Sequence, residues 1–201
     1  MTNFNFWRGG KIRLRAIEQK DLDDIVASTE EPDTELDRYE DVIHFPISQQ
    51  KDRDNLESLA QKGGTDDYFF WVIEDLQGNK VGFINTFDCE QRSGTFKYAL
   101  IIKRRYWGHG YAREAIQIVL RYYFRELRYQ KVTVMIYSFN ERSIRLHERL
   151  GFKLEGRLRR MVYTNGKFYD ELFYGMFIEE FDQIDKKSDL QDDVAGEIDS
   201  A

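Results

Sequence analysis

The sequence predicts an α+β protein with a central, mainly antiparallel sheet flanked by helices. Three stretches rich in aromatic and β-branched residues, 68–73, 80–87 and 95–102, follow one another with only short turns between them, as consecutive antiparallel strands do. Apolar residues then recur every three or four positions over 112–127, the spacing of one face of a long helix. Runs of strands followed by a helix favour an α+β sheet over a doubly wound one.

The chain before these strands contains one strand and a mixed helical region. Residues 11–17 alternate between polar and apolar side chains and predict the first strand. A helical stretch opens at Asp21, residues 30–48 are mixed and interrupted by two prolines, and a further helix is predicted over 49–61.

The chain beyond the long helix supplies the rest of the sheet. Residues 131–137 predict a strand and 141–150 a short helix. Asn165-Gly166 is the turn of a terminal hairpin whose last strand ends near Phe177. We expect one domain over 1–181, followed by an acidic, mostly flexible tail over 182–201.

Composition excludes several classes of function. A net charge of −6 and the lack of a basic arm argue against non-specific nucleic-acid binding. No apolar run approaches the ~20 residues of a membrane span, and the N-terminus lacks the features of a signal peptide. The single cysteine fits a reducing compartment, and no zinc-type spacing is present. We therefore expect a cytoplasmic protein without metal or membrane.

A basic, glycine-containing loop joins the strand 95–102 to the long helix. Gly108 and Gly110 can adopt positive φ and leave no side chain in front of the backbone amides. The first amides of the following helix have no intrahelical partner and lie at the positive end of the helix dipole. A phosphate or pyrophosphate is therefore the expected occupant of this loop.

Two other interpretations of the loop are weaker. The dinucleotide-binding fingerprint requires a small third residue where Arg113 stands, and the nucleotide-triphosphate P-loop motif is absent. An ordinary strand-to-helix turn that happens to hold two glycines is the remaining alternative.

Two motifs resemble those of the GNAT superfamily of N-acetyltransferases. Residues 105–110 are similar to its R/Q-x-x-G-x-G/A loop, which grips the pyrophosphate of acetyl-CoA, and residues 140–152 are similar to its N-x-x-S-x-x-L-[YH]-E-x-L-G-F segment. The first strand and its continuation resemble enzymes that acetylate ribosomal-protein N-termini. The segment around His147 resembles phosphinothricin and amino-acid acetyltransferases. The resemblance covers roughly residues 11–181 and implies the GNAT fold with acetyl-CoA as co-substrate.

The resemblance also implies which residues hold acetyl-CoA. Backbone amides of the strand before the loop would polarise the thioester carbonyl, and the segment that follows the next strand would contact the pantetheine arm. The implied donor-binding residues are Leu100, Ile101, Ile102, Arg105, Tyr106, Trp107, Gly108, His109, Gly110, Tyr111, Ala112, Asn140 and Ser143.

The catalytic residues are less well defined by the sequence. His147 occupies the position where most relatives carry a tyrosine that protonates the departing thiolate, and histidine titrates near pH 6.5, so a fraction would be imidazolium at neutral pH. A histidine packed against the core is the structural alternative. Asp88, Glu90, Tyr98 or a water chain could serve as the base.

The acceptor stays open at this stage. A protein N-terminus competes with a small amine or amino acid, and the acidic stretch 30–41 is either a solvated face or a docking surface for a cationic acceptor. A non-catalytic acetyl-CoA-binding module is the rival to an enzyme, and a homodimer is an open alternative. Cys89 lies far from both motifs in sequence, so we expect direct attack by the amine without an acetyl-enzyme.

Overall fold

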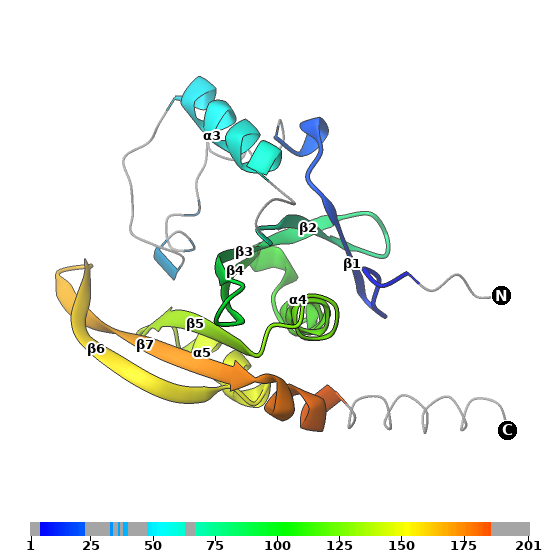
Figure 1. Cartoon of the computed structure of the whole chain (residues 1–201). Coiled ribbons are helices and arrows are strands. Elements are labelled where there is room, and N and C mark those ends of the chain that lie inside the picture. Colours follow the sequence, from blue (N-terminus) through cyan, green and yellow to red (C-terminus); the bar gives the residue numbers. More distant parts are fainter. Residues whose placement is uncertain are drawn as a thin grey trace, which may run out of the picture.

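The computed structural model describes residues 5–22, 33, 36, 38–39, 48–62 and 67–185. Within these residues one sheet is formed by β1 (Ile12–Ala16), β2 (Phe70–Asp75), β3 (Lys80–Glu90), β4 (Thr95–Ile102), β5 (Lys131–Tyr137), β6 (Lys153–Thr164) and β7 (Lys167–Phe177). The strand order is β1-β2-β3-β4-β5-β7-β6 (Figure 1).

The sheet is antiparallel except at its centre. β4 and β5 are parallel neighbours, and every other neighbouring pair is antiparallel. The predicted turn between β6 and β7 is confirmed, because Asn165 and Gly166 both have positive φ, of 51° and 74°. The predicted α+β class with a mainly antiparallel sheet is therefore confirmed.

Helices lie on both faces of the sheet. The main described helices are α3 (Gln49–Lys62), α4 (Tyr111–Arg125) and α5 (Glu141–Arg149), and a single 3-10 turn, η1 (Arg104–Tyr106), precedes α4. α3 lies on the opposite side of the sheet from α4 (Figure 1). None of the described helices is both long and apolar enough to cross a membrane.

The apolar face of α4 closes the core against the middle of the sheet. Its buried residues include Ile116, Val119 and Tyr123, each fully buried. Tyr123 stacks on Phe96 of β4 with ring centroids 4.0 Å apart. This packing fixes α4, which begins directly after the glycine loop, against β4.

The C-terminal boundary of the domain corrects the sequence-based expectation. Residues 178–185 are helical, and Phe181 and Asp185 are only 2% and 7% exposed. Asp185 pairs with Arg121 of α4 at 2.9 Å, and Asp182 pairs with Arg125 at 2.7 Å. The acidic residues Asp182 and Asp185 thus form ion pairs with arginines of α4, so a high content of acidic residues at 182–185 does not indicate a flexible tail.

Two other predictions fall partly outside the described residues. Residues 19–22 are helical, but the continuation of that stretch is not described, and neither is 186–201. Of the acidic residues between 30 and 41, the structure describes only Asp33.

We expect Phe181→Ala to lower the free energy of unfolding by about 3–5 kcal/mol, because it removes a buried ring packed 5.5 Å from that of Phe124. Phe177→Ala is the matched control, since Phe177 is 40% exposed and its loss should cost about 1 kcal/mol or less. Urea unfolding of the two variants measures the difference. Equal small losses would show that 178–185 contributes little to the domain.

Candidate functional site

The central feature of the site is a break in the sheet between β4 and β5. The two strands pair only from Thr95 opposite Lys131 to Lys97 opposite Thr133. Beyond these residues β4 continues to pair with β3, and β5 continues to pair with β7. The parallel strands therefore diverge towards their carboxyl ends and leave the edge of β4 unpaired next to the glycine loop.

Backbone alternation decides which amides face this opening. The N–H of Lys103 donates to the carbonyl of Val81 on β3 at 2.9 Å. Because successive residues of a strand point their N–H and C=O groups to opposite sides, Ile101 also faces β3, whereas Leu100 and Ile102 face β5. The expectation that Ile101 offers its amide to a ligand is therefore wrong, since that amide belongs to the β3–β4 ladder.

The side chain of Trp107 binds one of the backbone groups of β4 that face the opening. Its indole N–H donates to the carbonyl of Ile102 at 2.7 Å, which ties the loop back onto the end of β4. The guanidinium of Arg142, at the start of α5, stacks on the Trp107 ring 3.9 Å from its centroid. Trp107 therefore links the loop to both sides of the opening, while the amide of Leu100 stays unpaired with β5.

The glycine loop has the predicted backbone. Gly108 and Gly110 both have φ of +84°, and residues 108–110 are exposed. A side chain at Gly108 would meet no atom within 4 Å. The first intrahelical bond of α4 runs from Glu114 N–H to the carbonyl of Gly110, so the amides of Tyr111 and Ala112 stay available to an anion.

A segment far away in sequence completes the loop. The carboxylate of Glu114 accepts hydrogen bonds from the backbone amides of Gly10, Lys11 and Ile12 at 2.8–2.9 Å. This contact places the Lys11 ammonium beside the loop, where it donates to the carbonyl of His109 at 3.2 Å. Lys11 thus adds a cation beside the exposed amides of the loop. Sequence patterns could not reveal it, because only tertiary structure joins Lys11 to the loop.

The other loop side chains have mainly structural contacts. Arg104 forms two hydrogen bonds to Asp33, at 2.8 and 2.7 Å, so its charge is compensated. Arg105 is exposed and stacks on the ring of Tyr106 at 4.9 Å. His109 stacks on Tyr111 with ring centroids 5.4 Å apart. Arg105 is therefore the loop cation that remains exposed to a phosphate.

Asn140 caps α5 as predicted. Its side-chain oxygen accepts the N–H of Ser143 at 3.1 Å, which satisfies one of the free amides of the first turn. The cap fixes the start of α5 at the end of β5, directly beside the opening. A role for Asn140 and Ser143 in holding the donor remains a prediction.

His147 and Tyr98 form a buried pair between α5 and β4. The Nδ1 of His147 is 2.8 Å from the carbonyl of Ser143, which can only accept, so Nδ1 carries the proton. Nε2 is consequently an acceptor, and the Tyr98 hydroxyl donates to it at 2.8 Å. The two side chains are each 5% exposed. Tyr98 is the first residue of β4 beyond the β4–β5 pairing, so this bond joins α5 to the base of the opening.

Burial makes both groups of this pair neutral. Desolvation lowers the pKa of His147 to about 4 and raises the pKa of Tyr98 well above 10. The expectation that a fraction of His147 is imidazolium at neutral pH is therefore wrong. Neutral His147 is a poor acid for a departing thiolate, and a catalytic role for Tyr98 remains a prediction.

The two carboxylates expected near the reaction lie at the wrong end of the sheet. Glu90 pairs with Thr95 at the closed end of the opening, about 16 Å along β4 from Leu100 at ~3.3 Å per residue. Asp88 lies beside it and binds Lys97 at 3.0 Å. β3 continues to Glu90 through a bulge, where the sequence suggested a turn, and this carries both carboxylates away from the loop.

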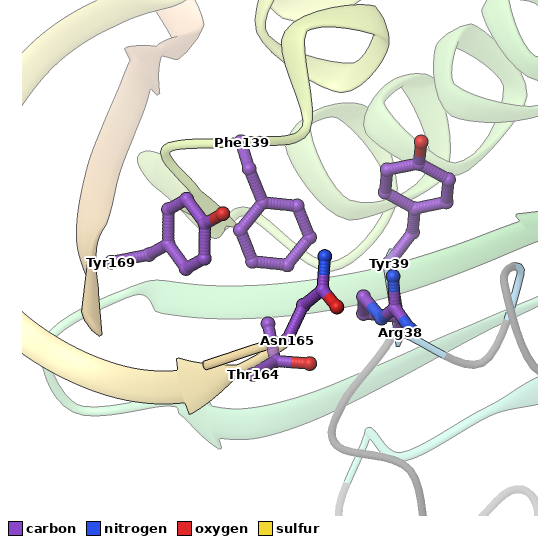
Figure 2. A pocket seen from close by; sticks show the side chains of 6 residues that line it. All are labelled: Arg38, Tyr39, Phe139, Thr164, Asn165 and Tyr169. Atoms are coloured by element: carbon purple, nitrogen blue, oxygen red, sulfur yellow. The ribbon is translucent and has the colours of Figure 1, made fainter. Parts of the chain in front are cut away.

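A pocket of about 160 Å³ lies beyond the open end of β5 (Figure 2). The loop after β5, the β6–β7 turn and an N-terminal segment supply its walls. Phe139 is central, with ring centroids 6.0 Å from Tyr39 and 4.7 Å from Tyr169. Sequence patterns did not single out this set. Its lining residues are Arg38, Tyr39, Phe139, Thr164, Asn165 and Tyr169.

Among the described residues, no group of three or more His, Cys, Asp or Glu side chains could hold a metal ion.

The buried pair should behave as one unit in a double-mutant cycle. His147→Phe alone should cost about 1–3 kcal/mol of unfolding free energy, because the buried Tyr98 hydroxyl loses its acceptor. Adding Tyr98→Phe should recover part of this loss, since both polar groups are then gone. Chemical denaturation of the four proteins measures the coupling. Strictly additive losses would contradict the hydrogen bond.

Protonation of His147 should oppose folding. Between pH 6.5 and about 4 the unfolded chain binds this proton and the folded chain does not, so stability falls as pH decreases through this window. The expected loss is about 3 kcal/mol. The double variant His147→Phe/Tyr98→Phe should lack the part of the pH-dependent loss of stability that comes from protonation of His147. An identical pH dependence of unfolding in the two proteins would refute the lowered pKa.

Comparison with known proteins agrees with this geometry. The acetyltransferase (GNAT) domain family matches residues 11–153. An uncharacterized N-acetyltransferase of Bacillus subtilis, YokL, derived from the SPbeta prophage, is 43% identical over 177 residues, which are 88% of this chain and 96% of YokL. A spermidine N-acetyltransferase from Vibrio cholerae, solved in complex with CoA and spermine, superposes with a TM-score of 0.73 at 25% identity over 86% of this chain and 99% of that one.

A putative acetyltransferase from T. thermophilus also superposes with a TM-score of 0.73, at 26% identity over 95% of this chain and 99% of that one. The family match covers the diverging strands, the glycine loop and α5, which together form the site. The chain therefore belongs to the GNAT family of N-acetyltransferases.

Proposed function

We propose that this N-acetyltransferase moves the acetyl group of acetyl-CoA to a primary amine by direct attack. The observation that carries the proposal is the unpaired edge of β4, which leads straight into a glycine loop with exposed amides. The loop amides, Arg105 and Lys11 hold the pyrophosphate, and the pantetheine arm lies between β4 and β5. The free thiol of Cys89 fits a cytoplasmic enzyme.

The amide of Leu100 is the group best placed to polarise the thioester. It faces the opening and is not paired with β5. A fixed amide dipole directed at the developing oxyanion contributes several kcal/mol of transition-state stabilisation. The side chain of Leu100 plays no part in this, so substitutions there would act only through packing.

Proton transfers require little from the protein. The attacking nitrogen bonds to the acetyl carbon, the carbon–sulfur bond breaks, and its electron pair leaves with sulfur. A thiol with a pKa near ~8.5 leaves as thiolate without an acid. The ammonium proton passes to water, since the two carboxylates expected near the reaction, Asp88 and Glu90, lie at the closed end of the opening. His147 and Tyr98 position α5 and β4.

Gly108→Val should reduce acetyl-CoA affinity by at least 10-fold, because a branched side chain then stands in front of the phosphate-binding amides. Gly166→Val is the matched control, since Gly166 also has positive φ and open space around it but lies in the β6–β7 turn. Calorimetric titration compares the two folded variants. Equal affinities would place the pyrophosphate elsewhere.

Cys89→Ala should retain turnover close to that of the parent protein. The Cys89 thiol is 3.2 Å from the carbonyl of Asp67, and burial raises its pKa, so it is a poor nucleophile. Initial-rate kinetics should show sequential binding of both substrates. A burst of CoA release without acceptor, abolished by Cys89→Ala, would instead indicate an acetyl-enzyme. If acetyl-CoA binds but no tested amine causes the release of CoA, the protein is a non-catalytic acetyl-CoA-binding module.

A further inference from the structure

The pocket beside Phe139 has a composition that discriminates between classes of amine. Three aromatic rings, from Tyr39, Phe139 and Tyr169, form an apolar wall (Figure 2). Thr164 and Asn165 add neutral polar groups. Among the lining residues that the structure describes, none is acidic and Arg38 is the charged one.

Arg38 is incompletely satisfied within the described part of the chain. Its Nε is buried and has no hydrogen-bond partner. An unpaired buried donor costs roughly as much as a lost hydrogen bond, and a carboxylate is the natural partner of a guanidinium because the two form parallel hydrogen bonds. The pocket therefore presents a cation that requires an anionic group of a ligand.

The location of the pocket connects it to the transfer reaction. Phe139 lies between Tyr137, the last residue of β5, and Asn140, the cap of α5. Both of those elements border the opening between β4 and β5. The loop is fixed to β7 because the Ser138 amide donates to the Asp170 carbonyl at 2.9 Å and the Ser138 hydroxyl accepts the Asp170 amide at 3.1 Å.

We propose that the pocket takes an acceptor that carries both a primary amine and a carboxylate, that is, a free amino acid. This inference rests on the proposed acetyl transfer and names its substrate class. The carboxylate pairs with Arg38, the side chain packs against the aromatic wall, and the amine faces the thioester.

A polyamine acceptor fits these residues poorly. A di- or polycation requires carboxylates or open aromatic faces without a competing positive charge, and here Arg38 repels it. Asp33, the described member of the acidic N-terminal stretch, is already bound to Arg104 by two hydrogen bonds. Spermidine N-acetyltransferases are thus relatives in fold whose named substrate differs in charge from the one inferred here.

The test compares each of the common amino acids with its carboxamide, which keeps the amine and side chain but removes the negative charge. CoA release is followed by thiol detection, and rates are corrected for the fraction of free amine. Spermidine and a peptide with a free N-terminus complete the panel. The parent protein should favour at least one amino acid over its amide by roughly 10- to 100-fold in kcat/KM, as expected for one charge-assisted hydrogen-bonded pair.

Arg38→Met keeps the apolar stem and removes the cation. It should abolish the preference for the acid over the amide by lowering kcat/KM for the acid, and it should leave acetyl-CoA affinity unchanged, because the donor binds at the glycine loop. Arg159→Met is the matched control, because Arg159 is an exposed arginine of β6 that does not line the pocket. This control should keep the full preference, and Arg38→Lys should restore part of it.

The outcomes separate this inference from the proposed function. Acceptance of spermidine or the peptide with no turnover of amino acids overturns the substrate class but leaves acetyl transfer intact. The same holds if acid and amide react equally in the parent protein. Binding of acetyl-CoA with no turnover of any amine in the panel overturns both the substrate class and the proposed acetyl transfer. Failure of acetyl-CoA to bind overturns the proposed function itself.

Discussion

The end of hydrogen bonding between β4 and β5 after Lys97 and Thr133 is the constraint on which the rest of the site depends. Two parallel strands that separate cannot satisfy each other's backbone groups, so an exposed edge remains inside the domain. The surrounding structure holds this opening on both sides. The Tyr98–His147 hydrogen bond joins β4 to α5 at its base, and Trp107 ties the loop to Ile102 at its mouth.

This arrangement favours catalysis by position and fixed dipoles over proton transfer by side chains. His147, which the sequence suggested as the acid, is neutral, and its two ring nitrogens are hydrogen-bonded to Ser143 and Tyr98. Acetyl transfer from a thioester to an unprotonated amine tolerates this, because the thiolate is a good leaving group. In the proposed mechanism, the protein contributes mainly alignment of the amine with the carbonyl and an amide at the oxyanion, which are effects of fixed geometry.

Local patterns in the sequence predicted most of the fold and the donor loop. The positive φ of Gly108 and Gly110, the Asn140 cap and the β6–β7 turn depend on neighbouring residues, so they can be inferred from the chain alone. Lys11 and the aromatic pocket could not, because residues far apart in sequence meet only after folding. The titration of His147 was misjudged for the same reason, since its pKa is set by burial.

The central claim is that acetyl-CoA occupies the opening between β4 and β5. Amide hydrogen exchange of the whole protein, with and without acetyl-CoA, tests it most directly. Slower exchange at Leu100, Ile102 and residues 105–112, with little change in β1 and β2, is the predicted result, because the ligand covers the unpaired amides of β4 and the loop. Unchanged exchange over 98–112 at saturating acetyl-CoA would contradict it.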